Sequence, residues 1–168
     1  PRGAAAGCRV ADAAGTRAPE CYALDREAGA RAGFLIRTEQ AYRDVWEADR
    51  PTGQARLLFA EDMDGHPQAT LFLVSCGPRV VEPYGGMTAR GAEDRANYLV
   101  KWEAIRTSRE RGATSSDLWG LATPGIAHFQ VGFGGRGGGC DLIGVGRIEA
   151  RASTERFEAP DKQLTGQL

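Results

Sequence analysis

Asp117 is the acidic residue that we consider the best candidate for catalysis. It lies in TSSDLWGLA, a run that predicts a short central strand. A carboxylate that points inward from such a strand is costly unless it is paired or takes part in chemistry. We therefore expect Asp117 to act as a general base or as an orienting group. Pairing with an arginine such as Arg95 would instead make it structural.

The segment 124–139, PGIAHFQVGFGGRGGG, carries glycines at a density that could indicate a phosphate cradle. No Gly-Lys-Ser/Thr follows them, so the segment is not a P-loop. We predict a tight turn that leads into a last strand over CDLIGVGRIEA (140–150). His128 could shuttle a proton, but a single histidine before a core phenylalanine is more often structural.

Metal chemistry is not expected, because the cysteines contain no CxxC pair and the two histidines lie far from them. We interpret Cys8, Cys21, Cys76 and Cys140 as reduced thiols of a cytoplasmic protein. The net charge of −1 gives no global attraction to nucleic acid or to an anionic membrane. No apolar run approaches the ~20 residues of a membrane span, and no signal peptide opens the chain. The start at PRGAAAG, without methionine, suggests a processed or excised segment.

Helices must carry the first part of the chain. Residues 1–17 show no period, and we expect a loose lead-in there. APECYALDREAGARAGF (18–34) predicts a short helix. TEQAYRDVWEADRP (38–51) predicts a better one, with Thr38 as its N-cap and Pro51 at its end.

The pattern then changes to strands over 54–63, 68–76 and 79–85, with DGHP as a hairpin signal between the first two. A long helix is predicted over 92–111, with Leu99, Trp102, Ile105 and Arg109 on its inner face. A short helix could begin at Pro124.

We therefore expect an α/β (α+β) fold, in which a mixed, mainly antiparallel sheet carries helices on both faces. The expected organisation is one domain over 18–150 and a frayed tail over 151–168.

Several separate short motifs in the second half of the sequence resemble those of the Fem family of peptidoglycan aminoacyltransferases. The matching motifs are Tyr84-Gly85, Asn97-Tyr98-Leu99, Trp102-Glu103-Ala104-Ile105, Asp117-Leu118-Trp119-Gly120 and the segment from Gly125 to Gly135. The resemblance runs from roughly residue 22 to 136 and covers the C-terminal, acetyltransferase-like (GNAT) half of that family. It implies transfer of an amino acid from aminoacyl-tRNA to an amine of a peptidoglycan precursor peptide. It implies no metal and no bound redox cofactor, and a second GNAT-like domain could be a partner.

The resemblance also suggests which residues form the site. Candidate substrate-binding residues are Tyr84, Arg95, Asn97, Tyr98 and Phe129. Tyr98 could instead pack on the sheet, and Asn97 could satisfy a loop. Gln130 stands where the family has a lysine near the reacting centre, so it would be a catalytic donor without charge.

Two further departures from known patterns bear on function. Ser116 replaces a usual tyrosine. The loop Arg90-Gly91-Ala92-Glu93-Asp94 has one glycine and two acids, where CoA-dependent acetyltransferases have a glycine-rich phosphate cradle. The carboxylates could repel pyrophosphate, or they could merely favour the helix dipole. Three functions stay open: a Fem-like transferase, an acyl-CoA-dependent N-acetyltransferase, and a non-catalytic or incomplete half that binds a precursor or partner. Trp102 and Trp119 are expected in the core.

Overall fold

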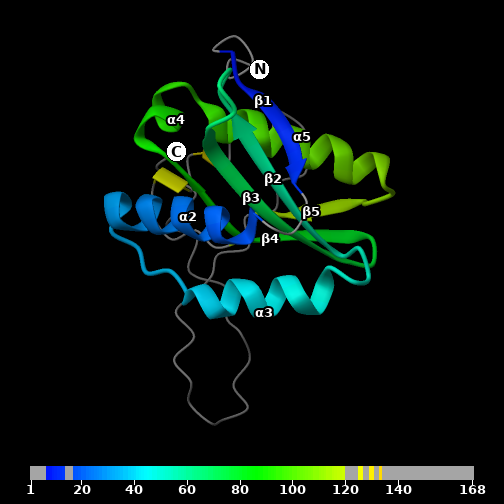
Figure 1. Ribbon diagram of the computed structural model, residues 1–168. Helices are drawn as coiled ribbons and strands as arrows, with labels where there is room; N and C mark the ends of the chain where they lie inside the picture. The colour runs from blue at the N-terminus through cyan, green and yellow to red at the C-terminus, as the bar shows by residue number, and fades with distance from the viewer. Residues whose placement is uncertain (1–6, 14–16, 120–124, 127–128, 131–132, 134–168) are drawn as a thin grey trace, which may run out of the picture. The chain divides into compact units, whose positions relative to one another are not determined.

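One sheet of five strands forms the centre of the fold, in the order β1-β2-β3-β4-β5 (Figure 1). The strands are β1 (Arg9–Ala13), β2 (Ala55–Glu61), β3 (Pro67–Cys76), β4 (Arg79–Met87) and β5 (Ser115–Asp117). The first four pair antiparallel, and β5 pairs parallel to β4. The mixed, mainly antiparallel sheet predicted from the sequence is therefore confirmed.

The coordinates are a computed structural model that describes residues 7–13, 17–119, 125–126, 129–130 and 133. The chain divides into two compact units at residues 119 and 120. All five strands and the four helices named below belong to the first unit.

Helices cover both faces of the sheet (Figure 1). On one face, α2 (Ala18–Ala32) and α3 (Glu39–Asp49) pack through Leu24, Tyr42 and Trp46. On the other face, α5 (Ala96–Glu110) packs through Leu99 and Val100. The short helix α4 (Ala89–Glu93) connects β4 to α5. All of β2 is buried because it lies between the two layers of helices.

Local signals in the sequence explain several element ends. The Thr38 side chain accepts a hydrogen bond from the Ala41 amide, as its predicted N-cap role requires. Gly33 ends α2 with φ of 74°, a left-handed conformation that favours glycine. The DGHP hairpin between β2 and β3 is confirmed by their antiparallel register.

Three local expectations were wrong. Residues 9–13, expected in a loose lead-in, form β1 and pair with β2. The helix expected over 92–111 is broken at Arg95, which adopts a φ of 56° and separates α4 from α5. Trp102 and Trp119, expected in the core, are 50% and 57% exposed.

The inner face of α5 uses smaller side chains than predicted. Ala96, Val100 and Ala104 are buried there, so the helix lies close to the sheet, and Trp102 points away.

Cys8, Cys21 and Cys76 are free thiols. Cys140, His128, the predicted strand over 140–150 and the predicted tail over 151–168 lie outside the described residues. None of the described helices is both long and apolar enough to cross a bilayer.

Candidate active site

The sheet opens between its two parallel strands. β4 pairs with β5 only from Arg79 to Val81, opposite Ser115 to Asp117, whereas β4 itself continues to Met87. Beyond Val81, the edge of β4 that faces away from β3 has no strand partner within the described residues. Backbone N–H groups on such an edge can donate to a bound carbonyl oxygen.

A β-bulge lies at the point where the strands part. Phe72 pairs with Tyr84 and Val74 pairs with Val81, so Glu82 and Pro83 together oppose one residue of β3. A bulge suits Pro83, which has no N–H to give to a ladder. The extra residue turns this part of β4 and sets the direction of its side chains.

Glu82 forms a buried ion pair with Lys101 of α5. Glu82 and Lys101 are only 5% and 3% exposed. The Lys101 ammonium donates to Glu82 Oε2, while Glu82 Oε1 is buried without a hydrogen-bond partner in the described structure. Burial raises the pKa of Glu82, the Lys101 charge opposes this rise, and the Asp117 charge adds to it. The Glu82 carboxylate, buried against α5, therefore holds a proton more readily than an ordinary glutamate.

Aromatic side chains lie on the α2 face of the same strand. Tyr84 stacks on Tyr42 with ring centroids 3.8 Å apart and an interplanar angle of 19°. The Tyr42 hydroxyl donates to the buried Asp25 of α2. Burial raises the pKa of Asp25, and the Tyr42 hydrogen bond opposes that rise. Gly86 is needed here because a Cβ on it would lie 2.5 Å from the Asp25 backbone.

The loop that follows β4 uses its own amide groups. Thr88 N donates to Gln68 O (3.0 Å), and Gly91 N donates to Thr88 Oγ1 (2.8 Å). Ala89 N donates to a carboxylate oxygen of Glu27 at 3.2 Å. A Cβ at Gly91 would lie 2.1 Å from Gln68 O, so the loop is packed tightly against β3.

Three further amides of this segment are engaged as well. Ala92 N, Asp94 N and Arg95 N donate to the carbonyls of Thr88, Arg90 and Ala92. Few of the N–H groups that would cradle a phosphate are therefore available.

Asp117 is not the inward-pointing residue of a central strand that we expected. β5 is the last strand of the described sheet, and Asp117 is exposed, with Oδ1 accepting a hydrogen bond from Trp119 N at 3.0 Å. Asp117 does lie beside Val81 in the register, close to the Glu82 pair. Its catalytic role stays a prediction.

The other predicted residues fall in two places, the start of α5 and the second unit. Arg95 is exposed at the start of α5, and Asn97 and Tyr98 are half-buried in the first turn of that helix. Asn97 Oδ1 accepts from Tyr98 N (3.0 Å), the next residue of the same helix, and the role of Asn97 in substrate binding stays a prediction. Phe129 and Gln130 belong to the second unit, where Phe129 contacts Phe133 edge to face at 5.3 Å.

Glu82 and Lys101 were missed by the sequence reasoning. Two signals could have found them. A proline in mid-strand, Pro83, indicates a bulge beside Glu82, and Lys101 is one of only two lysines in a chain whose basic residues are otherwise arginine.

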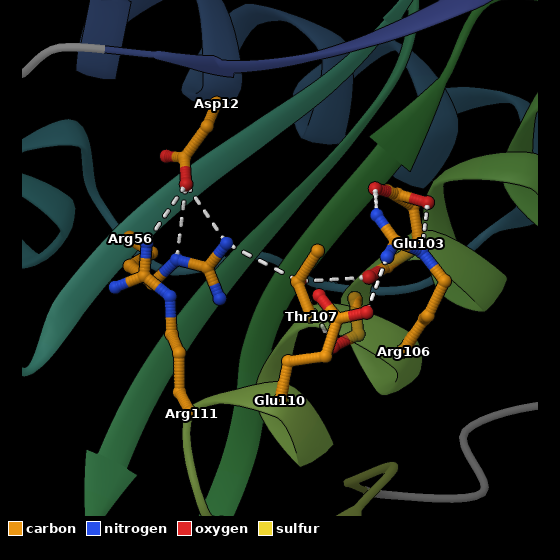
Figure 2. A network of polar contacts seen from close by, with 8 residues as sticks. Asp12, Arg56, Glu103, Arg106, Thr107, Glu110 and Arg111 are labelled. Carbon is orange, nitrogen blue, oxygen red and sulfur yellow. Dashed lines mark hydrogen bonds and ion pairs between the residues drawn. The ribbon is translucent and has the colours of Figure 1, made fainter.

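A second polar cluster surrounds a cleft of about 290 Å³ at the C-terminal end of α5 (Figure 2). The nearly buried Arg56 donates to Asp12 (2.8 Å) and to Thr107 (3.3 Å). On the adjacent helix surface, Arg106 pairs with Glu103 and Glu110. Because these charges neutralise one another, the cluster is a structural network that joins β1, β2 and α5.

One group of described residues, Asp62, Asp64 and His66, could hold a metal ion by its spacing. The Asp62 carboxylate already accepts hydrogen bonds from the amides of Asp64 and His66 and from the side chain of Gln68. These bonds shape the β2–β3 hairpin, so the group has a structural explanation.

Comparison with known proteins gives a family and a fold. The model of the acetyltransferase (GNAT) domain family matches residues 3–130. No curated protein matches the chain. FemX is similar in structure, with a TM-score of 0.69 and 14% identity over 76% of this chain, which spans 50% of the FemX chain.

Acetyltransferases are similar too. A GNAT acetyltransferase from Staphylococcus aureus Mu50 has a TM-score of 0.63 and 8% identity, with 76% of this chain and 83% of that chain covered. One from Brucella melitensis, in complex with acetyl-CoA, has a TM-score of 0.50 and 15% identity, with 66% and 74% covered.

Proposed function

Because the chain belongs to the acetyltransferase (GNAT) family, we propose that it is an acyltransferase of the Fem type that works in the cytoplasm. It would move an amino acid from the ester of an aminoacyl-tRNA to an amine of a peptidoglycan precursor peptide. The similarity to FemX in structure and the short sequence motifs shared with the Fem family support this proposal.

The choice of aminoacyl-tRNA over acyl-CoA as the donor is based on the loop after β4. A CoA-dependent enzyme would need free amides there to hold pyrophosphate. In this chain, Thr88 and Glu27 already accept from the amides of Gly91 and Ala89. Glu93 and Asp94 add negative charge beside them. The loop therefore favours a donor that does not dock through a pyrophosphate at this point.

We infer that acyl transfer takes place at the opening between β4 and β5. An amine that attacks an ester must be neutral, must lie close to the carbonyl, and needs a donor for the developing oxyanion. The outer edge of β4 beyond Val81 has no strand partner among the residues that the structure describes, and its backbone N–H groups can hold the carbonyl oxygen. Tyr84 lies on the opposite face of β4 from α5, and its contact with the acceptor peptide is part of this proposal.

Two other functions have support of their own. Similar acetyltransferases, one of them with acetyl-CoA bound, fit an acyl-CoA-dependent N-acetyltransferase equally well at the level of fold. The chain spans half of FemX, and Gln130 lacks the charge of the family lysine, which fits an incomplete half that only binds.

Calorimetric titration of the purified chain distinguishes these functions at the level of binding. We expect no measurable affinity for acetyl-CoA at physiological concentration, and binding of a UDP-linked muropeptide. Micromolar binding of acetyl-CoA, with heat that depends on the β4–α4 loop, would overturn the proposed donor.

A matched pair of variants tests the acceptor side. Tyr84 and Tyr22 both contact Tyr42, Tyr84 by stacking and Tyr22 edge to face at 5.3 Å. Tyr84→Ala should weaken muropeptide binding, whereas Tyr22→Ala should change stability alone. Equal affinity in the two variants would remove Tyr84 from the acceptor site.

A further inference from the structure

We propose that two copies of this chain pair through the outer stripe of α5, as antiparallel helices related by a two-fold axis beside Ile105. The outer stripe consists of Trp102, Ile105 and Arg109. Spacings of three and four residues put these side chains on one face of the helix. That face lies away from Val100 and Ala104, which are buried against the sheet. The pairing does not depend on the reaction proposed above.

The apolar part of the stripe is open to solvent. Trp102 is 50% exposed, and Ile105 is half-buried. In the part of the chain that the structure describes, no aromatic ring and no charged group lies against the Trp102 ring. Tryptophan is enriched among the residues that dominate protein interfaces, because its large ring removes much apolar surface from water on contact. The stripe therefore has a suitable anchor for a protein partner.

The cation of the stripe is available as well. Arg109 is exposed, and none of the carboxylates within the described residues lies at ion-pair distance from it. Its neighbour Arg106 differs, because Glu103 and Glu110 of the same helix already hold that guanidinium (Figure 2). A partner can therefore engage Arg109 without breaking an ion pair.

The positions of the ring and the cation make the stripe complementary to itself. In a two-fold dimer, residue i contacts residue j and residue j contacts residue i. An axis between Ile105 and Arg106 places Trp102 of one copy opposite Arg109 of the other, because the two residues are equally far from that axis along the chain. They are separated by roughly 10 Å along the helix. Two Trp–Arg contacts then flank a central contact between the Ile105 side chains.

A second copy suits this stripe better than an unrelated protein. An arginine guanidinium over the face of a tryptophan ring is a favourable cation–π contact, and tryptophan is the best ring for it. One copy supplies Trp102 and the other supplies Arg109, and the symmetry forms the contact twice. Contact through one helix face belongs to the small size class of interfaces. We therefore expect a reversible dimer that forms at micromolar concentrations or above.

Sedimentation equilibrium of the purified full chain, over a range from low micromolar to millimolar concentration, tests this pairing. The variants are Trp102→Ala and Arg109→Ala. The matched control is Trp119→Ala, because Trp119 is 57% exposed but lies outside α5. Thermal unfolding followed by circular dichroism checks that each variant is folded.

We expect the wild type to shift from monomer to dimer as its concentration rises. Trp102→Ala should raise the dimer dissociation constant by at least about tenfold. Arg109→Ala should raise it by less, and Trp119→Ala should leave it unchanged. A wild type that stays monomeric at every concentration would overturn the proposal and leave the stripe to a different partner. A dimer whose dissociation constant is the same in folded Trp102→Ala would overturn it too, since that dimer would use another face.

Discussion

Replacement of Lys101 by methionine should destabilise the fold far more than an ordinary surface change. The variant leaves the Glu82 carboxylate buried against α5 with neither oxygen paired to a cation. Breaking a buried pair by removal of one partner typically costs about 3–5 kcal/mol of the free energy of unfolding. We expect Lys101→Met to fall in that range.

The double variant Glu82→Gln/Lys101→Met is the control for this loss of unfolding free energy. When Glu82→Gln accompanies Lys101→Met, both charges disappear and the remaining groups are close in volume. Replacement of whole buried pairs is often neutral or stabilising by about 1–4 kcal/mol. We therefore expect the second substitution to recover most of the loss, so that the loss in the double variant is much smaller than the sum of the two single losses in a double-mutant cycle.

The loss of unfolding free energy in Lys101→Met should also depend on pH in a defined direction. Burial raises the pKa of folded Glu82, and loss of Lys101 removes the charge that opposes this rise. Between the unfolded and folded pKa values the folded state binds more protons, so stability falls as pH rises through that window. The deficit of Lys101→Met should therefore be full above the folded pKa and shrink as pH falls toward about 4.3.

Urea denaturation of the wild type, the single variant and the double variant at several pH values measures the loss of unfolding free energy, its recovery in the double variant and its pH dependence. A loss below about 1 kcal/mol for Lys101→Met, or equal losses in the single and double variants, would refute the reasoning. Either result would mean that water reaches the Glu82 carboxylate in the folded protein.

Three further outcomes are expected. Gly86→Ala should lower the free energy of unfolding by about 1–3 kcal/mol, measured by denaturation, because its Cβ would overlap the backbone of Asp25 on α2. Thr88→Ala should cost about 1 kcal/mol in thermal unfolding, because the Gly91 amide loses its side-chain cap. Gln130→Lys should raise kcat for transfer from aminoacyl-tRNA to a muropeptide by up to about 10²-fold, if position 130 holds the place of the family lysine.

Sequence patterns predicted the scaffold well because apolar periodicity and turn chemistry act locally. The strands over 55–61, 67–76 and 79–87 lie where runs of Leu, Val and Phe indicated them. β1 was missed because RVADA is short and is stabilised by its ladder with β2, which a local pattern does not contain. The break before α5 was missed because arginine at Arg95 gives no signal for a left-handed conformation.

The candidate site was harder to predict, because it depends on pairings between distant segments. Asp117 was favoured on the assumption of a central strand, whereas β5 lies at the edge of the described sheet. Glu82 and Lys101, 19 residues apart, look like ordinary solvent-facing charges until the bulge and α5 bring them together. Trp102 was assigned to the core by its place in the helical pattern, but close packing of α5 admits alanine and valine there instead.

Transfer by the purified chain alone tests the central claim most directly. The assay offers a labelled aminoacyl-tRNA or labelled acetyl-CoA as donor, with a UDP-linked muropeptide as acceptor, and measures label on the peptide. The account predicts aminoacylated peptide from the tRNA donor and no acetylated peptide from acetyl-CoA. Acetylated peptide without any aminoacyl transfer would contradict it.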